Sequence, residues 1–240
     1  MPLSPQLQFQ LALDLSSLEE ASRLVRLLAR RLTRIEVGTP LVISAGLASV
    51  AHIRQLAQAP VEIVADVKIC DAGERIARTA FAAGADVVTA VAAAIDQITW
   101  RGVLDAVGER VFQLDAPAPV LLDTIGPRLE PDALDRYARM AADAGVAVDL
   151  CIHRPKVGSP SFAELREQLG GAATGFNTLA IAGRLTPADV HEAHEAGFGT
   201  LIVGGAIADA ADPESAWAAF TDLAGSTEES GAPHGQSARR

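Results

Sequence analysis

Apolar runs of four to eight residues, rich in β-branched side chains, alternate along the chain with longer segments of helical period. Runs of this length are typical of buried strands, and their alternation with helical segments is typical of repeated βα units on a parallel sheet. Eight such pairs can be counted. The predicted strands are residues 7–14, 34–37, 61–67, 86–91, 119–125, 147–152, 178–183 and 200–205.

Glycine marks several boundaries: "AAGADVV" (82–88), "ADAGVAVDL" (142–150) and "HEAGFGTLIV" (194–203) each leave a helix through Ala-Gly and enter a strand. Glycine there can adopt the left-handed conformation that closes a helix. Eight βα units predict one α/β domain, a (β/α)8 TIM barrel over residues 1–225, with a doubly wound sheet as the alternative. Residues 226–240 are polar, lack apolar periodicity and are predicted to be a disordered tail.

Composition excludes several classes of protein. The net charge of -10 over 240 residues argues against a nucleic-acid partner, which requires a basic face. No apolar stretch is long enough to span a membrane, and "MPLSPQLQF" has no signal-peptide pattern, so we expect a cytoplasmic protein without a membrane partner. Cys70 and Cys151 lie in or beside predicted strands without CxxC spacing. This favours reduced structural thiols over a disulfide or a metal pair.

Charged side chains gather at the carboxyl ends of the predicted strands, which is where TIM barrels carry their active sites. Each one alone is explained as a helix cap or as an ordinary hydrogen-bonding residue. Together, acids crowded beside a lysine repel one another unless a metal or a substrate charge compensates them, so we predict a functional site. Its candidate residues are Asp14, Glu36, Asp66, Lys68, Asp71, Asp123, His153, Arg154 and Lys156.

The turns after the last two predicted strands carry glycines, at Gly183 and at Gly204 and Gly205. Backbone without side chains lets N–H groups point at an anion, and barrels commonly hold phosphate at these two turns. Arg184 adds a guanidinium that can pair with phosphate oxygens. The two turns therefore predict a phosphate-binding end of the site.

Short motifs follow one another along residues 7–224: "LALDL", "IEVGTPL", "ADVKICDAGE", "AGADVVT", "LLDTIG", "HRP", "IAGRLTP" and "IVGGAI". In this order and spacing they resemble the orotidine-monophosphate-decarboxylase suprafamily, and within it the 3-hexulose-6-phosphate synthase and 3-keto-L-gulonate-6-phosphate decarboxylase family. The resemblance implies a homodimeric barrel that binds Mg²⁺ and a sugar phosphate, with sites shared across the dimer interface.

The resemblance also implies roles by position. Glu36 and Asp66 match the magnesium ligands. Asp14 and Lys68 match residues that contact substrate hydroxyls or the developing enediolate, and Asp71 matches an aspartate that reaches the neighbouring subunit's site. These roles are expectations carried over from the family.

Further along the chain, Asp123 matches an acid that holds substrate or a water, and His153 matches the histidine that moves protons. Gly183, Gly204 and Gly205 match the glycines that bind the phosphate group in the family. Lys156 lies where the decarboxylases carry a basic residue. Because imidazole titrates near the working pH, His153 is the expected base, with Lys68 as electrostatic support for the oxyanion.

The function implied is a Mg²⁺-dependent aldol-type lyase that condenses formaldehyde with D-ribulose 5-phosphate through a metal-stabilised enediolate. A decarboxylase for 3-keto-L-gulonate 6-phosphate, or action on another pentulose phosphate, is the alternative. A pentulose-phosphate epimerase is disfavoured because the first three strands lack histidine. A non-catalytic sugar-phosphate sensor is disfavoured because the charged residues at the carboxyl ends of the strands are retained.

Overall fold

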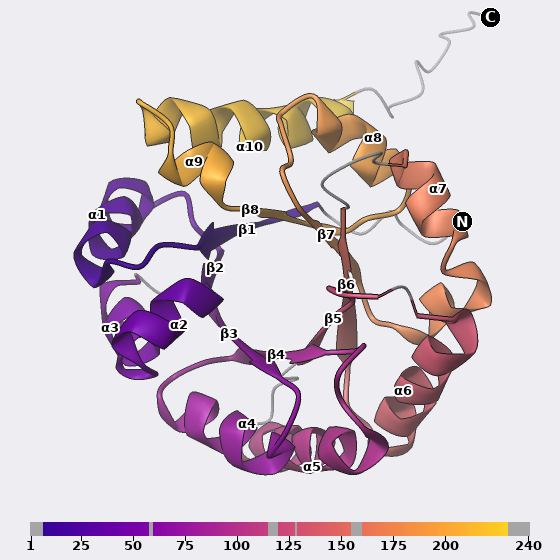
Figure 1. Cartoon of the computed structure of the whole chain (residues 1–240). Coiled ribbons are helices and arrows are strands. Elements are labelled where there is room, and N and C mark those ends of the chain that lie inside the picture. Colours follow the sequence, from indigo (N-terminus) through magenta and orange to yellow (C-terminus); the bar gives the residue numbers. More distant parts are fainter. Residues whose placement is uncertain (1–6, 58–59, 115–119, 128, 155–159, 230–240) are drawn as a thin grey trace, which may run out of the picture.

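Eight parallel strands close into a barrel in the order β1 to β8, with helices around the outside (Figure 1). The computed structural model describes residues 7–57, 60–114, 120–127, 129–154 and 160–229. Each strand pairs with the next one along the chain, and β8 pairs with β1. The TIM barrel prediction is therefore confirmed, and the doubly wound alternative is excluded.

All eight predicted strands are present, with ends that lie within two residues of the expected ones. Alternate residues of each strand point into the barrel, which sets the side chains available to a site. The strands are β1 Gln8–Leu13, β2 Arg34–Val37, β3 Glu62–Ile69, β4 Val87–Val91, β5 Val120–Asp123, β6 Val148–His153, β7 Leu179–Ala182 and β8 Thr200–Val203.

The helices pack their apolar faces on the outside of the barrel, and α1 shows how the sequence starts them. Ser17 caps this helix by accepting a hydrogen bond from the Glu20 backbone N–H at 3.3 Å. The described helices are α1 Leu18–Leu28, α2 Thr39–Ala45, α3 Ala48–Leu56, α4 Gly73–Ala82, α5 Gln97–Leu114, α6 Pro131–Asp143, α7 Phe162–Glu167, the 3-10 helix η1 Gly170–Gly175, α8 Asp189–Glu195, α9 Gly205–Ala208 and α10 Pro213–Glu229.

The barrel interior is filled in layers. At the amino-terminal end, buried Arg34 pairs with Glu62 at 3.2 Å and with Asp149 at 3.5 Å. The next layer is a small-residue and apolar cluster that contains Cys151 and seven other side chains. The polar residues at the carboxyl ends of the strands therefore rest on a packed floor rather than on an open channel.

Strand β3 is irregular where it carries the lysine of the "ADVKICD" motif. Ala65 pairs with Val88, but the next registered pair is Ile69 with Ala90, so the spacing along β3 exceeds that along β4. Lys68 lies in this bulge with a φ of 44°, in the left-handed region. Bulges beside active sites re-aim a side chain. The strand thus continues to Ile69, beyond its predicted end at residue 67, and Lys68 is part of it.

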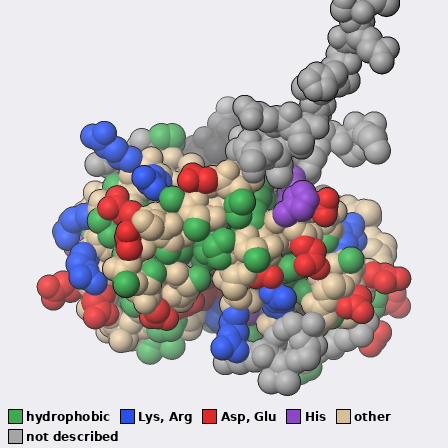
Figure 2. Space-filling view, turned by 90° about the horizontal axis from the view of Figure 1, so that it is seen from above, with side chains coloured by type: hydrophobic (Ala, Val, Ile, Leu, Met, Phe, Trp, Pro, Cys, Tyr) green, Lys and Arg blue, Asp and Glu red, His purple; other side chains and the backbone are tan. Residues whose placement is uncertain are grey.

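The last helix, α10, ends at Glu229, so residues 226–229 at the start of the predicted tail are helical. Residues 230–240 lie outside the described residues. Acidic, basic and apolar side chains are intermixed on the face that carries α9 and α10 (Figure 2). Among the described residues, no helix has the length and apolar character needed to cross a membrane.

Candidate active site

A cavity of about 860 Å³ opens at the carboxyl ends of the strands. It is lined by residues of all eight strands and of the turns after β7 and β8. Its walls carry ten of the residues that the sequence suggests as a site, so one chain assembles most of the predicted cluster. They are Asp14, Glu36, Asp66, Lys68, Asp123, His153, Gly183, Arg184, Gly204 and Gly205.

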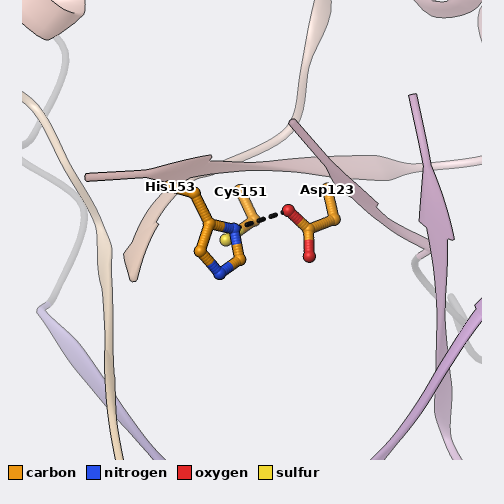
Figure 3. A group of neighbouring side chains, drawn as sticks. All are labelled: Asp123, Cys151 and His153. Carbon is orange, nitrogen blue, oxygen red and sulfur yellow. Dashed lines mark hydrogen bonds and ion pairs between the residues drawn. The ribbon is translucent and has the colours of Figure 1, made fainter. Parts of the chain in front are cut away.

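Asp123 and His153 form a hydrogen-bonded pair in this cavity (Figure 3). The strand register brings them together, because Asp123 of β5 lies opposite Cys151 of β6, and His153 is two residues further along the same face. Nδ1 of His153 lies 2.6 Å from Oδ1 of Asp123. The Ile125 backbone N–H also donates to Oδ1, at 2.8 Å. The imidazole is thus held in one orientation at the cavity wall.

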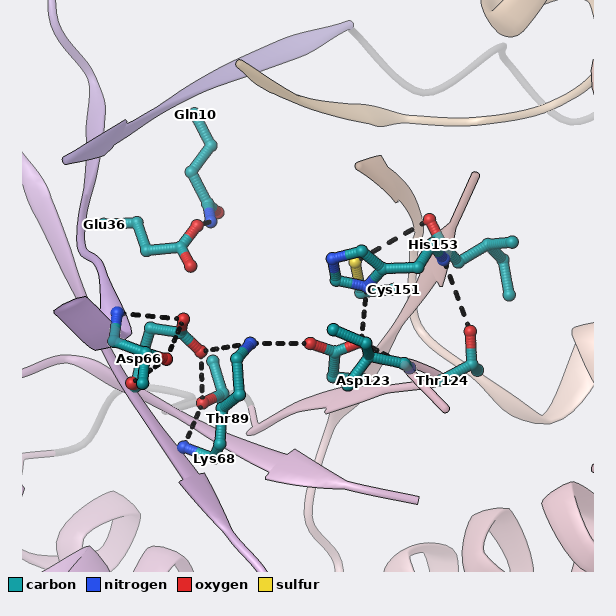
Figure 4. A network of polar contacts seen from close by, with 12 residues as sticks. Gln10, Glu36, Asp66, Lys68, Thr89, Asp123, Thr124, Cys151 and His153 are labelled. Atoms are coloured by element: carbon teal, nitrogen blue, oxygen red, sulfur yellow. Dashed lines mark hydrogen bonds and ion pairs between the residues drawn. The ribbon is translucent and has the colours of Figure 1, made fainter. Parts of the chain in front are cut away.

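Lys68 bridges two carboxylates from opposite sides of the site (Figure 4). Its Nζ donates to Oδ1 of Asp66 at 3.1 Å and to Oδ2 of Asp123 at 3.0 Å. Burial alone would lower the pKa of Lys68, but the two carboxylates outweigh burial and raise it above its ordinary value. Lys68 therefore remains an ammonium at working pH, and one polar network joins Asp66 to His153.

The same network lowers the pKa of Asp123. Burial acts to raise this pKa, but the hydrogen bond and charge of His153, together with the charge of Lys68, outweigh burial. Asp123 is therefore a carboxylate. Since a carboxylate only accepts hydrogen bonds, Nδ1 of His153 must donate, which leaves the lone pair on Nε2. His153 thus has the tautomer of a base whose free nitrogen is Nε2.

Two threonines, Thr39 and Thr89, hold Asp66 in place. Oδ2 of Asp66 accepts from the Thr39 hydroxyl at 2.6 Å and from its backbone N–H at 3.2 Å. The Thr89 hydroxyl donates to Oδ1 at 2.8 Å and accepts from the Lys68 backbone N–H at 2.9 Å. Thr89 therefore fixes both Asp66 and the strained backbone of Lys68.

Three carboxylates, Asp14, Glu36 and Asp66, share the corner of the cavity near β1 to β3. Burial raises the pKa of Glu36 well above its ordinary value, and the charges of Asp66 and Asp14 raise it further. Burial likewise raises the pKa of Asp14, with Asp66 adding to the effect. The Gln10 amide offsets only part of this by donating to Oε2 of Glu36 at 2.5 Å. Ionisation of Asp14 and Glu36 is therefore disfavoured unless a cation binds beside them.

The glycine of "EVGTP" allows this corner to close. A Cβ atom at Gly38 would lie 2.3 Å from Oδ1 of Asp14 and 2.7 Å from the Leu13 carbonyl oxygen. Only a residue without a side chain lets the β2 end approach Asp14. Gly38 thus contributes to the site although it offers no functional group.

The predicted phosphate end lies at the turns after β7 and β8, next to Asp14, because an added Cβ atom at Gly204 would lie 3.2 Å from Oδ2 of Asp14. Gly183 has a φ of 107°, and Arg184 beside it has a φ of 54°, which is unusual for a residue with a side chain. Gly204 and Gly205 lead from β8 into α9 on the same side. Exposed Arg184 lines the cavity at this end, where a phosphate can meet its guanidinium.

Three candidates lie apart from the others. Asp71 is exposed, does not line the cavity, and accepts a hydrogen bond from the Ala72 backbone N–H at 2.6 Å. Arg154 does not line the cavity either, because its guanidinium pairs with Asp189 at 3.0 Å and lies over the Phe162 ring. Lys156 lies outside the described residues. Substrate contact by Arg154 is therefore not supported by the side-chain position seen in this structure.

The model of the orotidine 5′-phosphate decarboxylase / HUMPS family matches residues 7–220. The chain belongs to this family. It is 32% identical over 212 residues to 3-hexulose-6-phosphate synthase of Bacillus subtilis, a match that covers 86% of this chain and 93% of that one. It is 33% identical over 210 residues to 3-keto-L-gulonate-6-phosphate decarboxylase of Escherichia coli, covering 85% and 88%.

Solved structures agree with this assignment to the orotidine 5′-phosphate decarboxylase / HUMPS family. The crystal structure of 3-hexulose-6-phosphate synthase from Salmonella typhimurium superposes with a TM-score of 0.73 at 26% identity, covering 92% of this chain and 99% of that one. The relatives are synthases and decarboxylases, and the chain is accordingly an enzyme, a lyase of the enediolate type.

Sequence reasoning missed several contributors to the site of this family member. Thr39, Thr89 and Gln10 act through hydrogen bonds to the carboxylates, and such roles depend on register that the sequence does not display. A usable signal existed for Thr39, which directly follows the glycine of "EVGTP" at a strand end. For Thr89 the only signal in the sequence was a weak one, a polar residue within an apolar run.

Proposed function

We propose that this lyase condenses formaldehyde with D-ribulose 5-phosphate to give a 3-hexulose 6-phosphate, with an enediolate as intermediate. The observation that supports the proposal most directly is the continuous network from Asp66 through Lys68 and Asp123 to His153 in the cavity. It combines a fixed ammonium with an oriented imidazole, which are the groups needed to remove a proton beside a carbonyl. Similarity to several 3-hexulose-6-phosphate synthases supports the substrate class.

In the proposed reaction, Nε2 of His153 takes a proton from C1 of the pentulose phosphate. The C1–H bond breaks, and its electron pair forms the enediolate, whose negative charge is stabilised by the Lys68 ammonium. The enediolate carbon then attacks the carbon of formaldehyde, forming the new C–C bond. The aldehyde oxygen becomes an alkoxide and receives the proton held by His153, so the imidazole returns to its starting state.

The carboxylates of Glu36 and Asp66 are the proposed Mg²⁺ ligands, and the donor set fits such an ion. Both residues offer hard oxygen ligands, and burial together with the charges of Asp66 and Asp14 raises the pKa of Glu36, an effect that a bound cation would oppose. Hydrogen bonds from Thr39 and Thr89 fix the orientation of Asp66. When bound, Mg²⁺ supplies positive charge that favours ionisation of a neighbouring hydroxyl and polarisation of a carbonyl.

The phosphate group is proposed to bind at the turns after β7 and β8. Gly183 and Gly204 leave backbone approachable there, and Arg184 contributes positive charge. This side adjoins the end of β6, because Ala182 of β7 pairs with His153, so a five-carbon chain bound there by its phosphate can extend over the mouth of the barrel toward Lys68. Binding energy from the phosphate thereby holds C1 near the base.

A decarboxylase that acts on 3-keto-L-gulonate 6-phosphate is the second candidate function. The specific observation in its favour is the 33% identity to the Escherichia coli decarboxylase, as high as the identity to the synthases. Loss of CO₂ from C1 of such a substrate also yields an enediolate, which the same lysine and metal ligands would stabilise.

Purified protein incubated with ribulose 5-phosphate in D₂O separates these functions. We expect Mg²⁺-dependent exchange of the C1 proton without formaldehyde, and formation of hexulose 6-phosphate when formaldehyde is added. Exchange without condensation, together with CO₂ release from 3-keto-L-gulonate 6-phosphate, would assign the decarboxylase. Absence of both exchange and CO₂ release would contradict the enediolate mechanism in either form.

Replacing Glu36 with glutamine is expected to abolish Mg²⁺ binding while stabilising the metal-free protein by about 2–4 °C in Tm. The reason is that the change removes one of three crowded carboxylates. Because folding raises the pKa of Glu36, the folded protein binds protons more tightly than the unfolded chain, and wild-type stability falls as pH rises above 4.5. The advantage of the variant should therefore grow with pH over this range.

Thermal unfolding with and without Mg²⁺, across a pH series, measures both effects of Glu36→Gln. The matched control is Glu167→Gln, which removes an exposed carboxylate at the end of α7. The control should change Tm little and should keep the stabilisation by Mg²⁺. A Glu36→Gln protein that Mg²⁺ stabilises as strongly as wild type would exclude Glu36 as a ligand.

We further propose that the enzyme is a homodimer in which Asp71 serves the partner's site. Asp71 is exposed, follows the carboxyl end of β3, and does not line its own cavity. Ile43 in α2 and Ile98 at the start of α5 are 79% and 84% exposed, and burial against a partner would remove this apolar surface from water. The proposed interface would include these residues together with Asp71.

Co-expression of Lys68→Met and Asp71→Asn chains with different tags tests the shared site. If each variant alone is inactive, a mixed dimer carries both changes in one site and neither in the other. Random pairing should then restore about one quarter of the wild-type activity. If the mixture stays inactive although mixed dimers form, Asp71 acts within its own chain.

A further inference from the structure

A second group of ligand atoms lies in the cavity, apart from the proposed magnesium ligands. The carboxylate of Asp123, the thiol of Cys151 and a ring nitrogen of His153 all lie within 4.8 Å of one another. Figure 3 shows the three side chains converging from neighbouring strands. Nitrogen, sulfur and oxygen ligands in one cluster are typical of sites for Zn²⁺ and related ions, whereas Mg²⁺ prefers oxygen alone.

We propose that Asp123, Cys151 and His153 form a second cation site, specific for a thiophilic divalent ion such as Zn²⁺, and that its occupation switches the enzyme off. The binding part of this proposal is independent of the proposed reaction. Only the inhibition rests on it, through the role of His153 as the base.

The strand register builds the cluster rigidly. Asp123 and Cys151 are paired residues on adjacent strands, and His153 follows Cys151 by two positions, so all three point into the barrel. Bonds of about 2.0–2.3 Å to one ion place tetrahedral ligand atoms roughly 3.3–3.8 Å apart. Since the atoms already lie within 4.8 Å, with Nδ1 and Oδ1 at 2.6 Å, side-chain shifts of less than about 1–1.5 Å would complete the geometry.

The thiol is reachable and lacks a strong partner. Cys151 is 2% exposed, yet it lines the cavity, so an ion that enters the cavity meets the sulfur. Its only described hydrogen bond is a weak one to the Ile152 carbonyl oxygen, at 3.9 Å. The surrounding layer of the barrel is otherwise small or apolar, so Cys151 is the one metal-binding side chain in that described cluster. Three protein ligands leave a fourth position toward the cavity for water.

Protons and charges balance on binding. The thiol releases one proton to solvent and becomes a thiolate, so thiolate and Asp123 together offset the two positive charges of the ion. The ion takes the place of the proton on Nδ1 of His153, and that proton is carried by Nε2 instead. Oδ2 of Asp123 keeps its contact with Lys68. Net, one proton leaves the protein.

This change removes the catalytic base. With Nε2 protonated and Nδ1 bound to the ion, neutral His153 has no lone pair with which to take a proton from C1. Magnesium ligands Glu36 and Asp66 are separate residues, so excess Mg²⁺ does not displace the inhibitory ion by competing for the same oxygens. The cavity thus discriminates between an activating hard cation and an inhibiting soft one.

Cobalt absorption tests the site without reference to activity. Cys70 and Cys151 are the two cysteines of the chain, so the Cys70→Ala protein has Cys151 as its single thiol. Titration of this protein with Co²⁺ is expected to give a near-ultraviolet thiolate-to-metal charge-transfer band that saturates at one equivalent and disappears on addition of Zn²⁺. The band should be lost in Cys70→Ala with Cys151→Ser and retained in Cys70→Ala with Glu36→Gln.

Inhibition is measured on wild-type protein as Zn²⁺-dependent loss of C1 proton exchange in excess Mg²⁺. We expect Cys151→Ser to need at least about tenfold more Zn²⁺ for half-inhibition. No charge-transfer band in Cys70→Ala, or a band that survives Cys151→Ser, would overturn the site. Inhibition that excess Mg²⁺ relieves would overturn the switch by assigning Zn²⁺ to Glu36 and Asp66. A band in a protein that shows no exchange at all would refute the proposed function and leave the metal site standing.

Discussion

Lys68→Met is expected to lower the rate of C1 proton exchange by at least about 10³-fold, because it removes the ammonium that, among the described residues, contacts both Asp66 and Asp123. Without it, nothing in the described network offsets the negative charge of the enediolate at that position. The methionine side chain has similar length, so the cavity keeps its shape. The measurement is C1 exchange in D₂O at saturating Mg²⁺.

The same substitution should also destabilise the protein, by about 2–3 kcal/mol, since two buried carboxylates lose their shared partner. The value lies toward the low end for a buried ion pair because the Lys68 side chain is 27% exposed. Arg78→Met is the matched control: it removes a cation that pairs with Glu74 and Glu109 on the surface. The control should retain exchange and lose little stability. Full exchange in Lys68→Met would exclude the lysine from the chemistry.

The sequence was sufficient to predict the barrel because the strands are short, mostly apolar runs and several helices have clear boundary signals, such as the Ser17 cap of α1 and Gly84 after α4. The same logic placed Asp14, Glu36, Asp66 and Asp123 correctly at one cavity, since the carboxyl ends of parallel strands meet at one end of a barrel. These predictions depend only on periodicity and on the direction of the strands. Both are visible in a single sequence.

What the sequence did not reveal depends on tertiary register. The bulge in β3 sets the direction of the Lys68 side chain. Nothing in "VADVKIC" predicts the bulge, because the positive φ falls on a lysine rather than on a glycine. Arg154 was expected among the site residues, but it contacts Asp189 and the Phe162 ring, which come from later elements whose approach cannot be read locally. The hydroxyl bridge of Thr89 is hidden for the same reason.

Asp123→Asn is expected to slow C1 exchange by about 10²–10⁴-fold while leaving the size of the side chain unchanged. An asparagine amide can offer His153 either an acceptor or a donor, so the imidazole is no longer confined to the tautomer with its lone pair on Nε2. Lys68 also loses one of its two carboxylates. The rate should fall in kcat for exchange more than in KM, since Asp123 is not among the proposed phosphate contacts.

The loss of stability caused by Asp123→Asn should depend on pH, because it arises from the loss of a charge that Lys68 and His153 contact. Folding lowers the pKa of Asp123 below 3.8, so its carboxylate contributes stability above that pH, and the contribution is lost as pH falls through the folded-state pKa. The gap in Tm between wild type and variant should therefore be widest near neutral pH and close in acid. Asp105→Asn, an exposed site in α5, should show no such trend. A gap that is independent of pH would mean that the substitution acts through packing rather than through the charge shared by Lys68, Asp123 and His153.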